Sequence, residues 1–201
     1  MENGDNINNK ENEKIELKED VNEESIIEEK NASNEDANKE DVSNVYKKEV
    51  NVTPKEVIGI ASDHRGYMVK QKLTKYLTKI GYTVLDYGTN TKDKADYPVY
   101  GFKLGKAIRD KKVSKGIAIC GSGIGISMAC NKVKGVRCAK VDNVSEAKYS
   151  RIDNDANAMA ISAKMPMFRA KDIVDAFLKT EFSSLERHRK RIQMLDNYEE
   201  D

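Results

Sequence analysis

A cysteine stands directly before a run of alternating glycines in the segment ICGSGIGIS, residues 119–127. Gly121, Gly123 and Gly125 allow a tight turn in which several backbone N–H groups point at one place, an arrangement that binds anions. Because a helical pattern follows, the positive end of that helix is expected to strengthen the same anion site. A thiol at a helix N-terminus is stabilised as the thiolate, so Cys120 is a candidate base or nucleophile beside an oxyanion site.

Two other interpretations of this loop stay open on the residues alone. The loop lacks the G-K-[ST] ending of a P-loop, and Ile126 stands where a G-x-G-x-x-G motif requires its last glycine. Asp142 nevertheless follows the loop at the spacing of the ribose-binding acid in a dinucleotide fold, which keeps nucleotide binding as an alternative. A dinucleotide site gives Cys120 no role, and the third interpretation of that cysteine is a buried residue at a strand end.

The chain has two histidines, His64 and His188, and two further cysteines, Cys130 and Cys138. Asp63 and His64 follow a predicted strand directly, which is where ligands bind in parallel-sheet proteins. A single histidine in a loop is more often a structural hydrogen-bond partner than a catalyst, and the two cysteines fit small buried residues of a helix and a strand. No cluster of His, Cys and Asp has the spacing of metal ligands, so we expect no metal site.

The elements that must position these residues alternate between strand and helix. Short apolar or β-branched runs predict strands over 57–62, 82–88, 115–120, 137–141 and 158–162, and helical spacing predicts helices over 67–80, 97–111, 124–132, 144–152, 169–179 and 185–198. This alternation predicts an α/β protein, a Rossmann-like three-layer α/β/α fold with a five-stranded parallel sheet. If the first and third strands are neighbours, Asp63 and His64 face Cys120 across a crevice.

Composition divides the chain near residue 55. Residues 1–50 hold ten Asn, and 16 Asp and Glu against 7 Lys and Arg, so their net charge of −9 leaves +10 for the remainder. We expect residues 1–55 to be a disordered acidic tail rich in Asn, Glu and Lys, because such a segment buries too little apolar surface to offset its ordering entropy, and residues 56–201 to be the folded domain. The basic remainder suits a small anionic substrate, whereas the dispersed lysines and the absence of Trp disfavour nucleic acid.

The sequence also bears on the compartment. No apolar run approaches the ~18 residues of a membrane span, and the acidic N-terminus lacks the apolar core of a secretory signal. Three cysteines without a pairing pattern fit reduced thiols. We therefore expect a cytoplasmic protein that makes no membrane contact.

Five segments, in the same order, resemble ribose-5-phosphate isomerase type B and the related galactose-6-phosphate isomerases. They are ASDHRGYMVKQKL, DYGTNTKDKADYPVYG, ICGSGIGISMACNKVKGVRCA, SRIDNDANAMAIS and ERHRKRI, and they cover about residues 57–195. The resemblance implies an aldose–ketose isomerase that uses no cofactor and acts on a small phosphorylated sugar. It also implies a homodimer or homotetramer whose active sites are shared across a subunit interface.

The resemblance assigns roles to individual residues. Cys120 becomes the base that moves a proton between C2 and C1 of the sugar, and Asn154 assists the enediolate oxyanion that the loop amides bind. Asp63, His64 and Ser122 contact the sugar and help at its ring. The other implied binding residues are Tyr97 in the pocket wall, Gly121, Gly123, Ile124 and Gly125 in the loop, and Lys164, Arg187 and Arg191 for the phosphate.

Two positions depart from the family pattern. Asp153 stands where the ribose enzymes usually have the histidine that opens the furanose ring, and Lys164 replaces a phosphate-binding arginine and loses its bidentate fork. We expect interconversion of ribose 5-phosphate and ribulose 5-phosphate, with Cys120 as base and with His64, Ser122 and Asp153 at ring opening. The alternatives are an isomerase of a hexose 6-phosphate, of allose or galactose type, and a sugar-phosphate-binding protein whose catalysis has decayed.

Overall fold

A computed structural model describes residues 56–198 of the chain, and the expected tail over residues 1–55 lies outside the described residues. The strands are β1 (Val57–Ser62), β2 (Thr83–Asp86), β3 (Lys115–Cys120), β4 (Cys138–Lys140) and β5 (Ala158–Ser162). The helices are α1 (Tyr67–Lys79), α2 (Tyr97–Arg109), α3 (Ile124–Asn131), α4 (Val144–Ile152), α5 (Met167–Lys179) and α6 (Glu186–Asp196). In this range no helix combines the length and apolarity that crossing a membrane requires.

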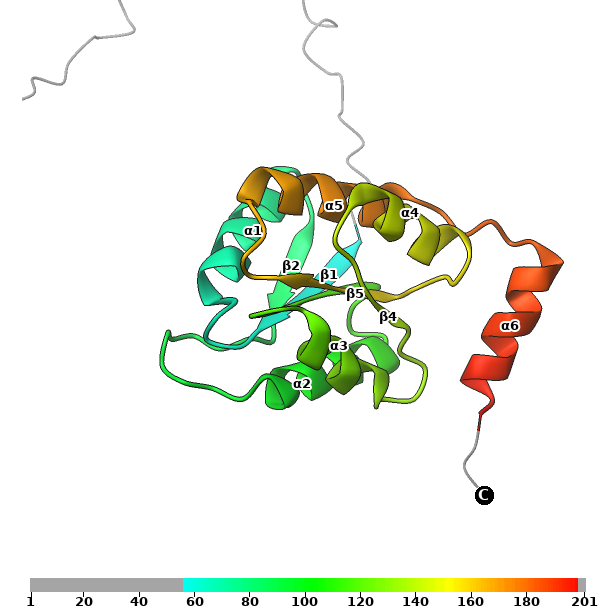
Figure 1. Cartoon of the computed structure of the whole chain (residues 1–201), viewed down its shortest axis with the longest axis horizontal. Coiled ribbons are helices and arrows are strands. Elements are labelled where there is room, and N and C mark those ends of the chain that lie inside the picture. Colours follow the sequence, from blue (N-terminus) through cyan, green and yellow to red (C-terminus); the bar gives the residue numbers. More distant parts are fainter. Residues whose placement is uncertain (1–55, 199–201) are drawn as a thin grey trace, which may run out of the picture. The chain divides into compact units, whose positions relative to one another are not determined.

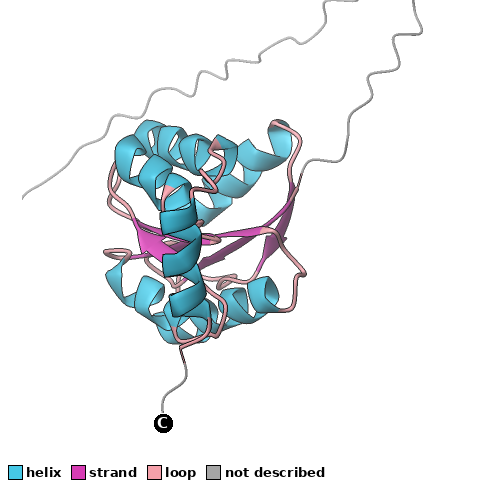
Figure 2. Cartoon of the chain, turned by 90° about the vertical axis from the view of Figure 1, so that its right-hand side faces the viewer, coloured by secondary structure: helices cyan, strands magenta, loops and turns pink. Residues whose placement is uncertain are grey.

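The five strands form one sheet in the order β2-β1-β3-β5-β4, and every neighbouring pair is parallel. Helices α1, α4 and α5 cover one face of the sheet, and α2 and α3 cover the other (Figures 1 and 2). This confirms the predicted three-layer Rossmann-like fold. The chain reverses its direction of progress along the sheet between β1 and β3, so the switch point, where such folds bind ligands, lies between these two strands.

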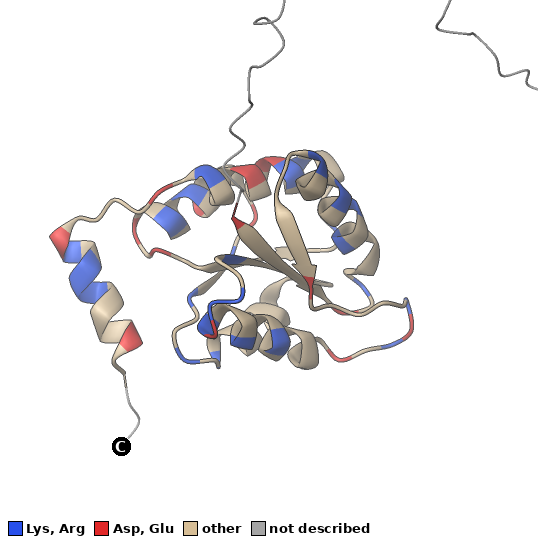
Figure 3. Ribbon diagram, turned by 180° about the vertical axis from the view of Figure 1, so that it is seen from behind, with Lys and Arg blue, Asp and Glu red and all other residues tan. Residues whose placement is uncertain are grey.

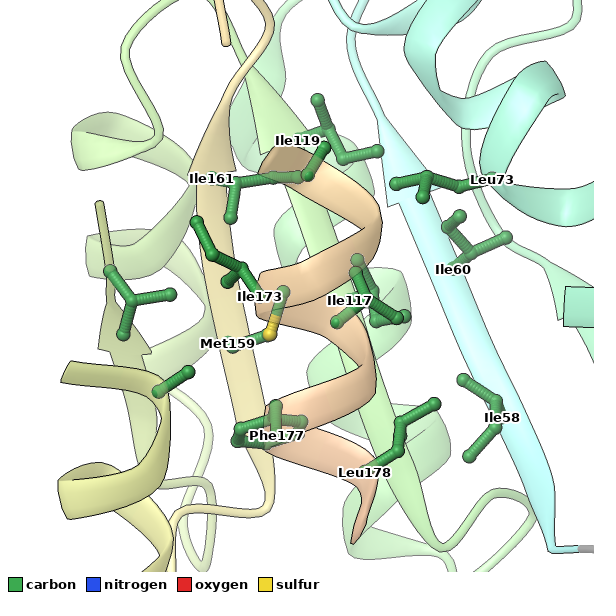
Figure 4. Close-up of a cluster of buried hydrophobic side chains, with 14 of the residues drawn as sticks. Ile58, Ile60, Leu73, Ile117, Ile119, Met159, Ile161, Ile173, Phe177 and Leu178 are labelled. Carbon is green, nitrogen blue, oxygen red and sulfur yellow. The ribbon is translucent and has the colours of Figure 1, made fainter. Parts of the chain in front are cut away.

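The sheet sends different side chains to its two faces, because successive residues of a strand alternate. Isoleucines of the central strands, including Ile58 and Ile117, pack with Phe177 of α5 in one fully buried cluster (Figure 4). On the α2 and α3 side the strands present small residues such as Ala118 and Ala160, which join Leu104, also fully buried, in a second cluster. Two separate hydrophobic clusters therefore pack against β3 and β5, one on each face of the sheet, and hold the ends of these strands in place.

The element boundaries differ from the predicted ones mainly at the sheet edges and at α5. The edge strands β2 and β4 have four and three residues, because each pairs on one side only. Helix α5 begins at Met167, earlier than predicted, since Pro166 precedes it as the N-cap residue and opens the helix. The predicted stop of α1 at Gly81 agrees with the left-handed backbone of that residue, φ 94°.

An ion pair between a buried lysine and an exposed aspartate joins α1 to the edge strand β2. The side chain of Lys70 is fully buried, and its ammonium group pairs with the carboxylate of Asp86 at the end of β2. The second oxygen of Asp86 accepts a hydrogen bond of 2.8 Å from the amide of Gly88. Because a buried charge without a partner is strongly destabilising, this pair fixes the place of α1 against the strand.

Helix α6 belongs to neither helical layer and stands beyond the β4 edge of the sheet (Figures 1 and 2). Arg137, just before β4, donates two hydrogen bonds of 2.9 and 3.0 Å to the carboxylate of Asp196 at the end of α6. The same guanidinium group also donates to the backbone carbonyl oxygens of Asn154 and Asp155. A single arginine thus ties α6 to the segment between α4 and β5.

Candidate active site

A pocket of about 320 Å³ opens at the carboxyl ends of β1 and β3, at the switch point of the sheet. The predicted site residues that line it are Asp63, His64, Tyr97, Cys120, Gly121, Ser122, Gly125 and Lys164. Since β1 and β3 are neighbours, the two polar motifs that follow them face each other as expected. The pocket therefore brings together residues from four separate segments of the chain.

Cys120 is the last residue of β3 and is only 4% exposed. Its Sγ accepts a hydrogen bond of 3.2 Å from the amide of Gly123 in the glycine loop. The neighbouring strand holds the backbone around it: the carbonyl oxygen of Cys120 accepts from the amide of Ala163 at 2.8 Å, and the Ser162 hydroxyl donates to the carbonyl oxygen of Gly121 at 2.9 Å. The thiol is thus fixed by the sheet and by its own loop.

The loop reaches this geometry through one left-handed residue. Gly123 has φ 79°, and a Cβ there would lie 2.9 Å from the carbonyl carbon of Ile161, so only glycine fits. Ile124, the first residue of α3, donates its amide to the Ser122 hydroxyl at 3.2 Å. Within the described residues, the amides of Ser122 and Gly125 donate no hydrogen bond, which leaves both available to an oxyanion.

Tyr97 and Gly125 form one wall of the pocket together. Tyr97 opens α2, and a Cβ at Gly125 would lie 2.7 Å from Cζ of the tyrosine ring. The absence of a side chain at this position is therefore what allows the ring to pack against the start of α3. The aromatic wall and the glycine loop are two sides of a single contact.

Asp63 and His64 are held by backbone groups. The carboxylate of Asp63, 5% exposed, accepts a hydrogen bond of 3.0 Å from the amide of Gly66 and so closes the turn between β1 and α1. Nδ1 of His64 lies 3.1 Å from the amide nitrogen and 3.0 Å from the carbonyl oxygen of Ala95. Nε2 of His64 has no hydrogen-bond partner within residues 56–198, so the ring is oriented with one nitrogen left for a ligand.

Three lining residues, Arg65, Ala95 and Asp96, were missed by the sequence analysis. The Arg65 side chain passes over the loop, with its Cδ 2.9 Å from where a Cβ of Gly121 would lie. Its exposed guanidinium group makes no ion pair within the described part of the chain, and with Lys164 it gives the pocket two cations. Only their position in the sequence could have indicated them, since each lies within two residues of a predicted one, His64 or Tyr97.

Gly123 and Ile124 belong to the loop without lining the pocket, and the remaining predicted residues, Asp153, Asn154, Arg187 and Arg191, lie outside it. Asp153 and Asn154 come between α4 and β5, at the amino end of β5, whereas Cys120 pairs in register with Ser162 at the carboxyl end of that strand. Because a strand rises about 3.3 Å per residue, the length of β5 separates the two positions within one chain. Within one chain the predicted site residues therefore fall into two groups, one at the carboxyl end of β3 and the other near the amino end of β5 and on α6.

Comparison with known proteins decides the family. The family model described as Ribose/Galactose Isomerase matches residues 58–195, which span nearly the whole described range. The chain belongs to this family. The resemblance read from the five sequence motifs is thereby confirmed, and with it the expected enzyme class, a sugar-phosphate isomerase.

Several relatives of the isomerase illustrate the match. It is 34% identical over 144 residues to ribose-5-phosphate isomerase B of Escherichia coli (strain K12), covering 71% of this chain and 96% of that protein. It is 32% identical over 141 residues to galactose-6-phosphate isomerase subunit LacB of Clostridium acetobutylicum, covering 70% and 82%. The solved structure of Clostridium thermocellum ribose-5-phosphate isomerase B is similar with a TM-score of 0.68 at 42% identity, covering 70% and 95%.

The strand order of the isomerase does not fit the alternative of dinucleotide binding. Asp142 follows β4, and β5 separates β4 from the strand that ends in Cys120. The carboxylate of Asp142 pairs instead with Lys140, and its amide donates to Glu146 of α4. No ribose-binding acid therefore stands beside the glycine loop at this position, and that interpretation of Asp142 is wrong.

A second, larger cavity of about 700 Å³ lies between β4 and α6, and the predicted residue Asn154 is part of its lining. Cys138 in its wall is buried, as predicted, and so is Cys130. The hydrogen bond with the Cys130 thiol, together with burial, raises the pKa of the Cys138 thiol well above its usual range. Such a thiol stays protonated and is a poor nucleophile, so Cys138 is not a candidate for catalysis.

Proposed function

We propose that the chain interconverts ribose 5-phosphate and ribulose 5-phosphate through an enediolate, with Cys120 as the base. The observation that carries this proposal is the thiol held against the glycine loop, where the Gly123 amide donates to Sγ at 3.2 Å. The relatives from E. coli and C. thermocellum, which are named as ribose-5-phosphate isomerases, support the pentose as substrate.

The proposed reaction places each group of the pocket in a step. The Cys120 sulfur removes the proton from C2 of the open-chain aldose, and the electron pair moves onto the C1 carbonyl oxygen. The free amides of Ser122 and Gly125 donate to the oxyanion as its charge develops, which is where preorganised donors have the largest effect. After a proton passes from the C2 hydroxyl to the C1 oxygen, the thiol returns its proton to C1 and leaves the ketose.

Ring opening precedes this step and needs groups that exchange protons with the furanose. His64 has a ring nitrogen without a protein partner in the described range, and Ser122 carries a hydroxyl beside the loop. We assign both to the ring oxygen and the anomeric hydroxyl. Lys164 and Arg65 add positive charge to the same pocket, which favours a phosphorylated substrate.

We propose further that the site is completed by a second copy of the chain in a homodimer. The pocket holds the base, while the two exposed arginines predicted to bind phosphate, Arg187 and Arg191, lie on α6 beyond the far edge of the sheet. Basic residues occupy the first half of α6, directly after the acidic residue at its start, and a second acidic residue stands at its end (Figure 3). In a two-fold dimer each α6 then serves the pocket of the other subunit.

The first experiment is turnover of the purified protein on ribose 5-phosphate, allose 6-phosphate and galactose 6-phosphate. The proposal expects the highest kcat/KM on the pentose. Activity confined to a hexose 6-phosphate would replace the substrate and keep the mechanism. Absence of turnover on all three, with sugar phosphates still bound in calorimetry, would favour a decayed binding protein.

Complementation between subunits tests the shared site. The single variant Cys120→Ser and the double variant with Arg187→Ala and Arg191→Ala are each expected to be nearly inactive. Random mixing of the two should restore about a quarter of wild-type activity, because half of the dimers are mixed and each mixed dimer has one intact site. No recovery after verified subunit exchange would show that both halves act within one chain.

A further inference from the structure

His188, at the start of α6, is contacted on both of its ring nitrogens. The side chain is buried, with 5% of the residue exposed. Nδ1 lies 3.0 Å from the hydroxyl of Ser183 and 3.5 Å from Oδ1 of Asp153. On the other side, Nε of Arg187 donates a hydrogen bond of 3.1 Å to Nε2. The imidazole thus connects the carboxylate of Asp153 to the guanidinium group of the preceding residue, Arg187.

The arginine fixes where the imidazole proton must be. The guanidinium group of Arg187 is always charged and only donates, so Nε2 of His188 has to accept and carries no hydrogen. The single hydrogen of the neutral ring is then on Nδ1. A carboxylate only accepts hydrogen bonds, so Asp153 stabilises this tautomer, and the Ser183 hydroxyl accepts at the shorter distance.

The tautomer in turn orients the arginine. With Nε engaged by His188, the two terminal nitrogens of Arg187 form the planar fork that binds a phosphate oxygen pair. Arg191 lies one turn further along α6 and is exposed, without an ion pair in the described residues. The side chain of Asp153 is 45% exposed, and its carboxylate contacts His188, which in turn contacts Arg187. Asp153 is thus at one end of a row of three contacting side chains, and the group proposed to bind phosphate is at the other.

We propose that Asp153 is a positioning residue, which acts through His188 to hold Arg187 in the orientation that binds the phosphate of the substrate. This replaces the part in ring opening that the family resemblance suggests for position 153. The inference rests on the proposed function for the nature of the ligand, a sugar phosphate. Inorganic phosphate serves as the probe, so the binding test does not depend on turnover.

The first test compares Asp153→Asn with a matched control, Glu181→Gln. The control removes one carboxylate from the segment before α6, and in the structure Glu181 makes no contact with His188. Calorimetry with inorganic phosphate should show Kd weakened about five- to tenfold by Asp153→Asn and unchanged by Glu181→Gln. With ribose 5-phosphate, Asp153→Asn should raise KM while kcat stays within about twofold.

A second variant tests whether Asp153 works through the arginine. Lysine has a single ammonium group, which cannot both donate to Nε2 of His188 and present a planar fork to phosphate. Arg187→Lys therefore removes the coupling between His188 and the phosphate-binding group but keeps the positive charge. Asp153→Asn should then add nothing to the phosphate Kd in the Arg187→Lys background. A further loss of the full size in that background would overturn the proposal.

The tautomer itself can be observed, because the chain has only two histidines. In the ¹⁵N-histidine NMR spectrum of the full chain, with His64→Gln to assign the signals, His188 should show the Nδ1–H tautomer. Asp153→Asn should shift it toward a mixture of tautomers. An unchanged tautomer and phosphate Kd, with kcat lowered on ribose 5-phosphate, would return Asp153 to ring opening. If the wild-type protein isomerises none of the sugars, the proposed function is rejected. The phosphate-binding and NMR experiments still test the role of Asp153 in that case, because neither depends on turnover.

Discussion

The pocket around Cys120 and the cluster around His188 are built in different ways. The first is made by backbone groups: a strand end, a left-handed glycine and helix amides, set between two neighbouring strands. The second is made by long side chains, where Arg137, His188 and Asp196 connect a helix that stands outside the layers. A group that must meet a reacting carbon needs the rigid support of the sheet, whereas a phosphate can be held by side chains on a separate helix.

The largest expected effect comes from Cys120→Ser, which tests the first region alone. A hydroxyl is a far weaker base than a thiolate, so kcat should fall by about 10²–10⁴-fold while the Kd for inorganic phosphate stays unchanged. Cys138→Ala serves as the control, since it removes a thiol outside the pocket. Near-normal turnover of the serine variant in a coupled assay would remove Cys120 as the base.

A pair of glycines tests whether the loop is fixed by packing as well as by its backbone conformation. Gly123 and Gly135 share φ 79°, but a Cβ at Gly123 would meet the backbone of Ile161, whereas a Cβ at Gly135 would meet nothing within 4 Å. Gly123→Ala should lower the free energy of unfolding by about 2–4 kcal/mol. Gly135→Ala should cost only about 1–2 kcal/mol, the strain of the left-handed conformation.

Urea denaturation at constant m-value measures both glycine variants. Equal losses in the two would show that the close contact between the loop and β5 does not restrain the pocket. The comparison of the two regions would then lose its physical basis, because the loop would be no more rigid than an exposed turn.

Asp196→Asn tests the second region by weakening its connection to the sheet. The carboxylate accepts two hydrogen bonds from Arg137, and the partly exposed pair is worth about 0.5–1.5 kcal/mol. We expect faster hydrogen exchange in α6 by mass spectrometry, a phosphate Kd weakened about two- to fivefold, and an unchanged alkylation rate at Cys120. Slower alkylation of Cys120 would mean that the two regions are coupled within a chain.

The smallest expected effect concerns the Cys138 thiol, which belongs to the core outside both regions. The pKa of Cys138 is raised by its hydrogen bond with Cys130 and by burial, so the folded state keeps a proton that the unfolded chain loses. Its contribution to stability is complete below about pH 8.5, the pKa of an unfolded thiol, and is lost as the pH rises toward the folded value.

The Tm of wild type should therefore fall between pH 8 and pH 10 more steeply than that of Cys138→Ala. Calorimetry can detect this difference when the folded state binds about half a proton more than the unfolded state. Other groups that titrate in this range contribute equally to both proteins and cancel in the difference. Identical slopes would show that the thiol pair carries no such linkage.

Much of the first region could be predicted from the sequence, because its signals are local. The β-branched run before Asp63 and the apolar run before Cys120 mark two strand ends, and the parallel fold brings such ends to one edge. The alternating glycines indicate the anion loop by themselves. Arg65 was missed because an exposed arginine after a histidine has no pattern that separates a pocket wall from a solvated surface.

The second region could not be predicted in the same way, because its contacts join residues that are distant in sequence. His188 looked like a single histidine, and only the fold brings it next to Asp153. The position of α6 beyond β4 also leaves no mark in its amphipathic spacing, since a helix packed in a layer shows the same period. The motifs indicated candidate residues, but not that these residues fall into two groups at opposite ends of the strands.

The ion pair of Lys70 and Asp86 has a consequence for how the chain selects its register. Strand β2 has four residues and is mostly exposed, so its hydrophobic pattern alone specifies its alignment on β1 only weakly. A slip of one residue would carry the Asp86 carboxylate away and leave a fully buried ammonium group without a counter-charge, at a cost of about 3–5 kcal/mol. The ion pair thus discriminates against misaligned strands, and it lets a short, polar edge strand add to the sheet in one way.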